Sequence, residues 1–167
     1  MRNLTQISFE EAITQNKEAI FRICRIYAVA PLEPEDLSQE VIFQVWKSFD
    51  SCQGKSNLKT WIYRVSLNVC MSSKLKHEKK QTVRLDGVSF LESEENNDEQ
   101  SSRFLALKHC IETLPEADRS VVILFLEELP YAEIAKVTGL TVNHVAVKMK
   151  RIRKKLFGCI TAKLEEL

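Results

Sequence analysis

Residues 131–156, YAEIAKVTGLTVNHVAVKMKRIRKKL, carry the signals of two short helices joined by a tight turn. Pro130 suits the start of the first helix, because its missing N–H would have no intrahelical partner there. Gly139 suits the end of that helix, because glycine takes the left-handed C-cap conformation without steric cost. Thr141 can then cap the second helix by accepting a backbone N–H bond. The stretch therefore predicts a helix-turn-helix.

The second of these helices has one apolar side and one polar, cationic side. The apolar side repeats at steps of three and four residues and consists of Val142, Val145, Met149, Ile152 and Leu156. The opposite side and its borders hold the candidate DNA contacts, which are Asn143, His144, Val147, Lys148, Lys150 and Arg151. This arrangement is typical of a recognition helix in the major groove. From the residues alone, the alternative is a C-terminal core helix with a solvated basic face.

Length and composition indicate a globular protein with enough apolar material for one ordinary domain or two small ones. The chain has 167 residues, of which 44% are hydrophobic and 28% charged. Its net charge is only +1, but the charges are segregated. Basic residues gather at 74–84 and 148–155, and acidic residues gather at 92–99. Phosphate binding depends on local cation density, so this segregation favours a nucleic-acid partner.

The cysteines and histidines give no metal-site spacing. The three histidines lie far apart, and no CxxC pair occurs among Cys24, Cys52, Cys70, Cys110 and Cys159. We expect five reduced thiols, no metal, no cofactor and no small-molecule substrate. Without a nucleophile–base or ligand cluster, the sequence does not predict an enzyme. It also has no apolar run of about eighteen residues and no signal-peptide hydrophobic region, so we expect a cytoplasmic protein without membrane insertion.

Three helices with short connections are predicted over residues 1–80. The first opens at a capping box formed by Ser8 and Glu11. The second and third are expected over about 34–49 and 58–79, on either side of a polar loop. The second carries its apolar residues on the side expected to be buried, and these are Leu37, Val41, Ile42, Val45, Trp46 and Phe49.

The third predicted helix combines apolar and hydrogen-bonding side chains. We expect Trp61, Val65 and Val69 to face the core, while the side of Tyr63 is left open. A polar stripe, expected on the opposite side, consists of Arg64, Asn68 and Ser72. An amide and a hydroxyl on a rigid helix, followed by lysines, can bond exposed base edges while the cations hold phosphates.

Residues 81–101 are acidic and polar, without sustained periodicity, and predict a flexible linker. The alternative is that its apolar residues Val88, Phe90 and Leu91 dock on one of the domains. Helical spacing then returns, and Pro115 separates two predicted helices that lead into the helix-turn-helix, the second of them over residues 116–128. The sequence therefore predicts an all-α protein of two small helical domains, residues 1–80 and 102–167, joined by that linker.

The ordered set of motifs resembles the extracytoplasmic-function group of sigma-70 type RNA polymerase sigma factors. PEDLSQEVIFQVWKSF is similar to the family's region 2.2, and LKTWIYRVSLNVC is similar to regions 2.3–2.4. IETLPEADRSVVIL and the helix-turn-helix that ends in KRIRKKL are similar to region 4. The resemblance covers about residues 8–80 and 102–160.

This resemblance implies a subunit that binds core RNA polymerase, directs it to promoters and helps to open them. It implies core binding through Asp36, Gln39, Glu40 and Phe43. It implies recognition of an unpaired −10 element by Arg64, Asn68, Ser72, Lys76 and the loop residue Cys52. The candidate contacts of the helix-turn-helix would bind the −35 element. Such proteins are commonly held inactive by an anti-sigma protein, so the resemblance also implies that partner.

Some positions depart from the family pattern. Many members carry an aromatic residue where Cys52 stands, an acidic or amide residue where Ser72 stands, and a basic one where Ala146 stands. These departures concern promoter sequence rather than core binding. The alternative function is a stand-alone helix-turn-helix regulator that dimerises on duplex DNA, and it leaves the acidic and amide patch of the second helix unexplained.

Overall fold

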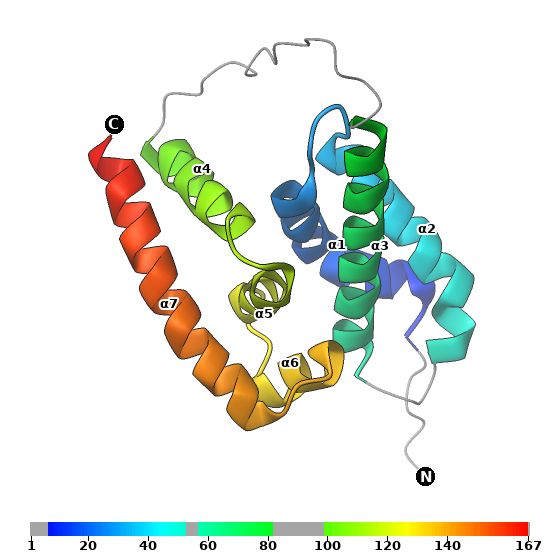
Figure 1. Ribbon diagram of the computed structural model, residues 1–167. Helices are drawn as coiled ribbons and strands as arrows, with labels where there is room; N and C mark the ends of the chain where they lie inside the picture. The colour runs from blue at the N-terminus through cyan, green and yellow to red at the C-terminus, as the bar shows by residue number, and fades with distance from the viewer. Residues whose placement is uncertain (1–6, 53–56, 82–98, 167) are drawn as a thin grey trace. The chain divides into compact units, whose positions relative to one another are not determined.

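The computed structural model describes residues 7–52, 57–81 and 99–166, which form seven α-helices and no strand (Figure 1). The all-α prediction is confirmed. The chain divides into two compact units, Met1–Lys80 and Gln81–Leu167. Most of the predicted linker lies outside the described residues. Its last residues belong to a helix that begins at Glu99, three positions before the predicted domain start at residue 102.

The first unit contains α1 (Phe9–Tyr27), α2 (Pro34–Cys52) and α3 (Leu58–Gln81). The predicted capping box is present: the Ser8 hydroxyl accepts from the Glu11 N–H at 3.2 Å, and the Glu11 carboxylate accepts from the Ser8 N–H at 3.1 Å. The ring of Phe9, which opens α1, packs edge-on against Phe49 near the end of α2, with centroids 5.7 Å apart. These two helices therefore run in opposite directions. Helix α2 continues three residues past its predicted end.

The predicted core side of α3 is wrong. The side chains that are buried are Thr60, Ile62, Tyr63, Ser66, Leu67 and Cys70, whereas Trp61, Val65 and Val69 are half-buried. At about 100° per residue, Trp61 and Asn68 lie about 20° apart around the helix axis, so the predicted apolar and polar stripes are neighbours rather than opposites. Ser66 tolerates burial because its hydroxyl donates to the Ile62 carbonyl at 2.8 Å.

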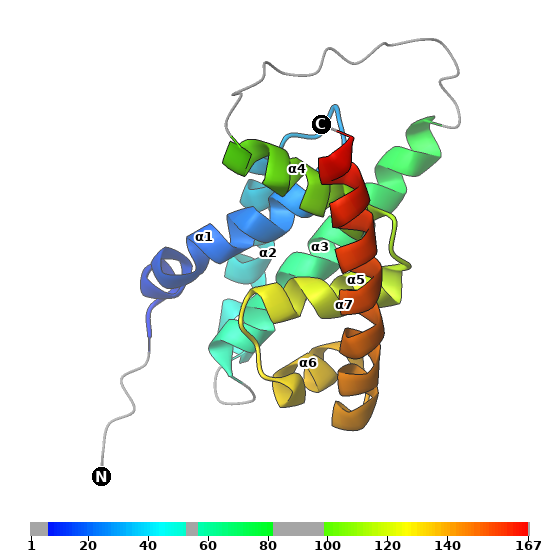
Figure 2. The same ribbon diagram turned by 90° about the vertical axis from the view of Figure 1, so that its left-hand side faces the viewer.

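The second unit contains α4 (Glu99–Glu112), α5 (Glu116–Leu126), α6 (Tyr131–Thr138) and α7 (Val142–Glu165). Helix α7, orange to red in Figures 1 and 2, packs against α4, α5 and α6. The helix-turn-helix is confirmed as α6 and α7. Gly139 ends α6 in the left-handed region at φ 76°, and the Thr141 hydroxyl accepts from the His144 N–H at 3.1 Å. Pro130 occupies the N-cap, one position before the first helical turn.

The apolar side of α7 is nearly as predicted. Val145, Met149, Ile152 and Leu156 are buried. Val142, the first residue of the helix, is instead 50% exposed. Helix α7 also extends nine residues beyond the predicted stretch, to Glu165.

A buried guanidinium joins the first two helices of this unit. Arg119, on α5, donates to the backbone carbonyls of Glu112 at 2.7 Å and Leu114 at 3.1 Å, where α4 ends and the turn to α5 begins. It also pairs with the Glu116 carboxylate at 2.9 Å. Carbonyls at a helix C-terminus lack intrahelical partners, so Arg119 acts as a side-chain cap for α4.

Helix α5 ends two residues before its predicted end, in a Schellman motif. The N–H of Leu129 donates to the Leu124 carbonyl, and the N–H of Glu128 donates to the Phe125 carbonyl. Glu128 takes φ 63°, the left-handed region that this motif requires.

The expectation of five reduced thiols is wrong for two of them. Cys110 on α4 and Cys159 on α7 form a disulfide across 49 positions of sequence, whereas Cys24, Cys52 and Cys70 are free. The pair was not predicted because the contact between α4 and α7 is a tertiary one, which cysteine spacing does not reveal.

Candidate nucleic-acid interface

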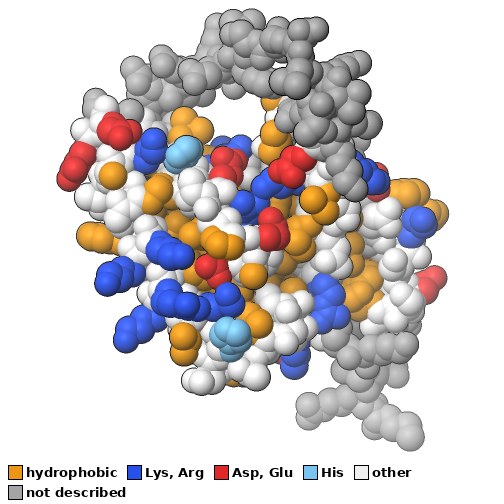
Figure 3. Space-filling view, viewed as in Figure 1, with side chains coloured by type: hydrophobic (Ala, Val, Ile, Leu, Met, Phe, Trp, Pro, Cys, Tyr) orange, Lys and Arg blue, Asp and Glu red, His pale blue; other side chains and the backbone are white. Residues whose placement is uncertain are grey.

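The outer face of α7 presents cations and hydrogen-bonding groups to solvent. The exposed candidates are Asn143, His144, Val147, Lys150 and Arg151, joined by Lys154 and Lys155. Figure 3 shows Lys and Arg side chains gathered over the middle of this helix. In the part of the chain that the structure describes, no carboxylate pairs with Lys150 or Arg151. Their charge is therefore available to an anionic ligand.

Two other cations of α7 are engaged within the unit. The Lys148 ammonium lies 2.8 Å from the Asp118 carboxylate of α5, and both side chains are only 15% exposed. The Arg153 guanidinium lies over the Phe125 ring, 4.8 Å from its centroid. Lys148 was a predicted DNA contact, but its charge is neutralised and largely shielded. We therefore assign Lys148 a structural role and omit it from the candidate surface.

The outer face of α3 differs in chemistry from that of α7. Its exposed side chains are Arg64, Asn68, Ser72 and Lys76, so the predicted polar stripe does face solvent. The half-buried Trp61 lies beside Asn68 on the same face. Tyr63, whose side the sequence left open, is buried. The face thus combines an amide, a hydroxyl and an aromatic ring with the two cations Arg64 and Lys76.

Cys52 does not fit its predicted role as a base contact. It is the last residue of α2, and its side chain is only 5% exposed. The loop positions 53–56, on which the rest of that prediction falls, lie outside the described residues.

The predicted polymerase-facing side of α2 is exposed along its length. Asp36, Gln39 and Glu40 are exposed, and Phe43 is 49% exposed. Trp46, which the sequence placed on the apolar side, is 60% exposed and stacks on Phe43 with centroids 6.1 Å apart. Residues three positions apart are neighbours on a helix surface, so the spacing of Trp46 from Phe43 was the sequence signal that the two lie on the same exposed face. An acidic and amide patch thus continues into an exposed aromatic pair.

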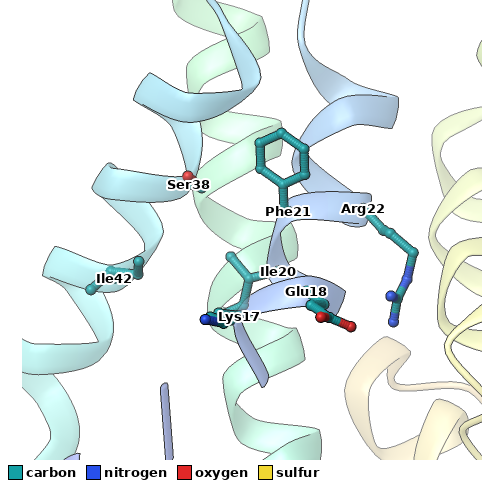
Figure 4. Close-up of a pocket in the computed structure, with 7 residues that line it drawn as sticks. All are labelled: Lys17, Glu18, Ile20, Phe21, Arg22, Ser38 and Ile42. Atoms are coloured by element: carbon teal, nitrogen blue, oxygen red, sulfur yellow. The ribbon is translucent and has the colours of Figure 1, made fainter. Parts of the chain in front are cut away.

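A shallow pocket lies between α1 and α2, with a volume of about 460 Å³. Figure 4 shows Phe21, Ile20 and Ile42 among its lining, with the charged groups of Lys17, Glu18 and Arg22 around them. The Ser38 hydroxyl at the pocket donates to the Glu35 carbonyl at 2.8 Å. The lining contains neither histidine nor cysteine.

The described residues contain no group of three or more His, Cys, Asp or Glu side chains that is arranged to hold a metal ion. None of their helices combines the length and apolar character needed to cross a membrane.

Comparisons with known proteins match each unit separately. The family model for Sigma-70 region 2 matches residues 12–80, and that for Sigma-70, region 4 matches residues 104–156. RNA polymerase sigma factor SigV of Bacillus subtilis is 23% identical over 154 residues, covering 92% of this chain and 91% of the relative. ECF RNA polymerase sigma factor SigE of Mycolicibacterium smegmatis is 25% identical over 158 residues, covering 89% of this chain and 60% of the relative.

Two solved structures share the fold. The sigma factor RpoE from Bartonella quintana, in complex with the anti-sigma factor NepR, gives a TM-score of 0.71 at 18% identity, covering 92% of this chain and 96% of that one. CnrH in complex with the cytosolic domain of CnrY gives a TM-score of 0.66 at 18% identity, covering 92% and 88%.

Proposed function

The chain belongs to the sigma-70 family, as an extracytoplasmic-function RNA polymerase sigma factor, and from this premise we propose which of its surfaces direct promoter-specific initiation. A sigma factor binds core RNA polymerase, brings it to a promoter and starts transcription there. Region 2 falls within the first unit and region 4 within the second. Core polymerase and promoter DNA are therefore the partners whose contact surfaces need to be assigned.

We assign the −35 element to the outer face of α7. This assignment depends on the exposed cations Lys150 and Arg151, which have no acidic partner among the described residues. They lie beside the exposed Asn143, His144 and Val147. Arginine and lysine bind guanine edges or phosphates, asparagine binds adenine, and an aliphatic side chain contacts the thymine methyl group. A surface of this kind suits duplex DNA in the major groove.

We assign the −10 element to the outer face of α3, through Arg64, Asn68, Ser72 and Lys76. Unpaired bases expose edges that an amide or hydroxyl can bond, and an aromatic ring such as Trp61 offers a stacking surface. Arg64 and Lys76 supply cations for the backbone of the strand. The central amide and hydroxyl, flanked by these cations, suit bases whose edges are exposed.

We assign core polymerase to the exposed face of α2, through Asp36, Gln39, Glu40 and Phe43, and we add Trp46. Carboxylates and amides are suited to a basic protein surface, which the clamp helices of the polymerase would supply. Exposed tryptophan side chains are over-represented among the residues that dominate binding energy at protein interfaces. The stacked pair of Phe43 and Trp46 thus gives this polar face an apolar anchor.

We also propose an anti-sigma protein as a regulatory partner, since the solved neighbour RpoE is in complex with the anti-sigma factor NepR. Sigma factors are not enzymes, and we propose that this chain has no catalytic activity of its own. Because it acts together with RNA polymerase, its working compartment is the cytoplasm. A stand-alone duplex-binding regulator is not favoured, because it gives no role to the region 2 match.

The core-binding face can be tested by measuring the affinity of purified core polymerase for labelled protein. Changing Gln39 and Glu40 to Ala together, or Trp46 to Ala, should weaken binding about tenfold or more, because interface anchors are worth about 2 kcal/mol each. Glu10→Gln, which alters an exposed residue on α1, is the matched control and should bind normally. Unchanged affinity in both α2 variants would remove this face from the proposal.

A further inference from the structure

We propose that Cys110 and Cys159 form a reversible dithiol–disulfide site that couples the surrounding thiol–disulfide balance to the stability of the second unit. The chemistry of this site is independent of the proposed function. Its consequence for transcription rests on the assignment of the −35 element to α7. The reactant is a low-molecular-weight thiol or its disulfide.

The disulfide links the first and last helices of the second unit, which contains the candidate −35 surface. It joins α4 to α7, with the two Cα atoms 5.9 Å apart, and it closes a loop that contains α5, α6 and most of α7. The candidate −35 residues therefore lie inside the closed loop. Cys159 follows them on the same helix, within the segment beyond the helix-turn-helix.

The two sulfurs differ in access. Cys110 is fully buried, whereas Cys159 is half-buried. Cys159 lies on α7 between the exposed residues Phe157 and Gly158 and the half-buried Ile160, close to the end of the helix at Glu165. Cys159 is thus the sulfur that an outside thiol reaches first, and Cys110 is the leaving and resolving partner.

The three other cysteines show what an unreactive thiol looks like in this protein. The sulfurs of Cys24 and Cys70 lie only 3.9 Å apart in the first unit, yet both residues are fully buried. The hydrogen bond with Cys24 and burial raise the pKa of the Cys70 thiol far above its usual range. Cys52 is buried as well. Nothing comparable encloses Cys159, so exchange in the native protein should be confined to the second unit.

Reduction proceeds in two exchange steps. An outside thiolate attacks Sγ of Cys159, which breaks the protein disulfide, forms a mixed disulfide at Cys159 and releases the Cys110 thiolate to take up a proton. A second outside thiolate attacks the outside sulfur of the mixed disulfide and releases the Cys159 thiolate, which is protonated in turn. Two outside thiols are oxidised to one disulfide, and two electrons pass to the protein. Oxidation is the reverse reaction.

A protein that works beside RNA polymerase is in a compartment where disulfides are usually transient and redox-sensing rather than permanent. The bond should therefore open under ordinary conditions and close under oxidative stress. Closing it restricts the unfolded chain and holds α4 against α7, which stabilises the unit.

The test equilibrates the full-length native protein in glutathione buffers from fully reduced to fully oxidised. The reaction is then quenched, and free thiols are counted by mass after alkylation under denaturing conditions. The proposal expects five free thiols at the reduced end, three at the oxidised end, and a return to five when the buffer is reversed. Cys159→Ser should remove the change, whereas Cys52→Ser should keep it with one thiol fewer at each end.

Thermal unfolding shows which unit the disulfide stabilises. Both tryptophans, Trp46 and Trp61, lie in the first unit, so tryptophan fluorescence reports the unfolding of that unit alone. Oxidation should raise the far-UV circular dichroism transition of the second unit by on the order of 10 °C. It should leave the tryptophan fluorescence transition unchanged, and Cys159→Ser should abolish the shift.

A thiol count that stays at five, or at three, in every buffer would overturn the proposal. So would a thermal shift that persists in Cys159→Ser. If the thiol count changes from five to three and back but the protein does not direct transcription, the proposal for this disulfide is supported and the proposed function is contradicted.

Discussion

Helices α3 and α7 are both 24 residues long, and each carries the proposed DNA surface of its unit. Their outer faces nevertheless differ. Helix α7 presents Lys150 and Arg151 without acidic partners, whereas α3 centres on Asn68 and Ser72 with Trp61 beside them. The same scaffold is thus fitted to two states of DNA: dense cations suit the phosphates of a duplex, and amide, hydroxyl and ring suit the bases of an open strand.

The largest effect is expected from Arg119→Met, which should remove the duplex surface as a whole. The change leaves the carbonyls of Glu112 and Leu114 without their charged donor and should destabilise the second unit by about 3–5 kcal/mol. Circular dichroism would lose the transition of the second unit, while tryptophan fluorescence would still report a folded first unit. The stability of Arg119→Lys should lie between that of the unchanged protein and that of Arg119→Met, because an ammonium lacks the planar, forked donors of a guanidinium. Lysine that performs as well as arginine would contradict the capping role.

Asn68→Ala tests the α3 surface by itself. Its side chain is exposed, so the fold should survive. Loss of a base contact should reduce affinity for unpaired −10 DNA, in complex with core polymerase, by about 10–100-fold, or about 1–3 kcal/mol. Binding of the same variant to −35 duplex should be unchanged. An equal loss on both DNAs would mean that the two surfaces are not separate.

Arg151→Ala tests the charge of α7. It should weaken duplex binding and reduce the slope of log affinity against log salt by about one unit. Lys148→Met is the matched control, because the Lys148 charge is already neutralised by Asp118. It should keep the salt slope and instead cost about 1–2 kcal/mol of stability in the second unit. A changed slope in Lys148→Met would return Lys148 to the DNA surface.

The smallest effect is expected from Glu128→Gly, which relieves the left-handed backbone of an exposed residue at the α5–α6 turn. Stability of the second unit should rise by about 0.5–1 kcal/mol, with duplex affinity unchanged. Chemical denaturation of the full chain would measure the gain. A loss of stability would mean that the Glu128 side chain makes a contact worth more than the backbone strain.

The parts of the fold that rest on local chemistry could be predicted from the sequence. A left-handed cap at Gly139, a hydroxyl cap at Thr141 and the capping box at Ser8 each involve residues within a few positions of one another. The buried side of α7 was nearly correct for the same reason, because its apolar residues form a single stripe.

The parts that depend on tertiary contacts could not be predicted. Apolar residues occur on most sides of α3, so periodicity alone did not select the buried side. Ser66 is a polar residue on that buried side, and it is tolerated there because its hydroxyl donates to the Ile62 carbonyl of the same helix. Trp46 was assigned to the core because hydropathy does not distinguish an exposed binding residue from a buried one. The pair of Lys148 with Asp118 spans 30 positions, and that of Cys110 with Cys159 spans 49.

The most direct test of the central claim is run-off transcription with bacterial core RNA polymerase on the DNA upstream of the gene for this chain. The account predicts a discrete start site that requires the protein. Asn68→Ala should reduce the product at the opening step, and changing Gln39 and Glu40 together should abolish it through loss of core binding. Duplex binding by the protein alone, with no association with core polymerase, would contradict the account and favour a stand-alone regulator.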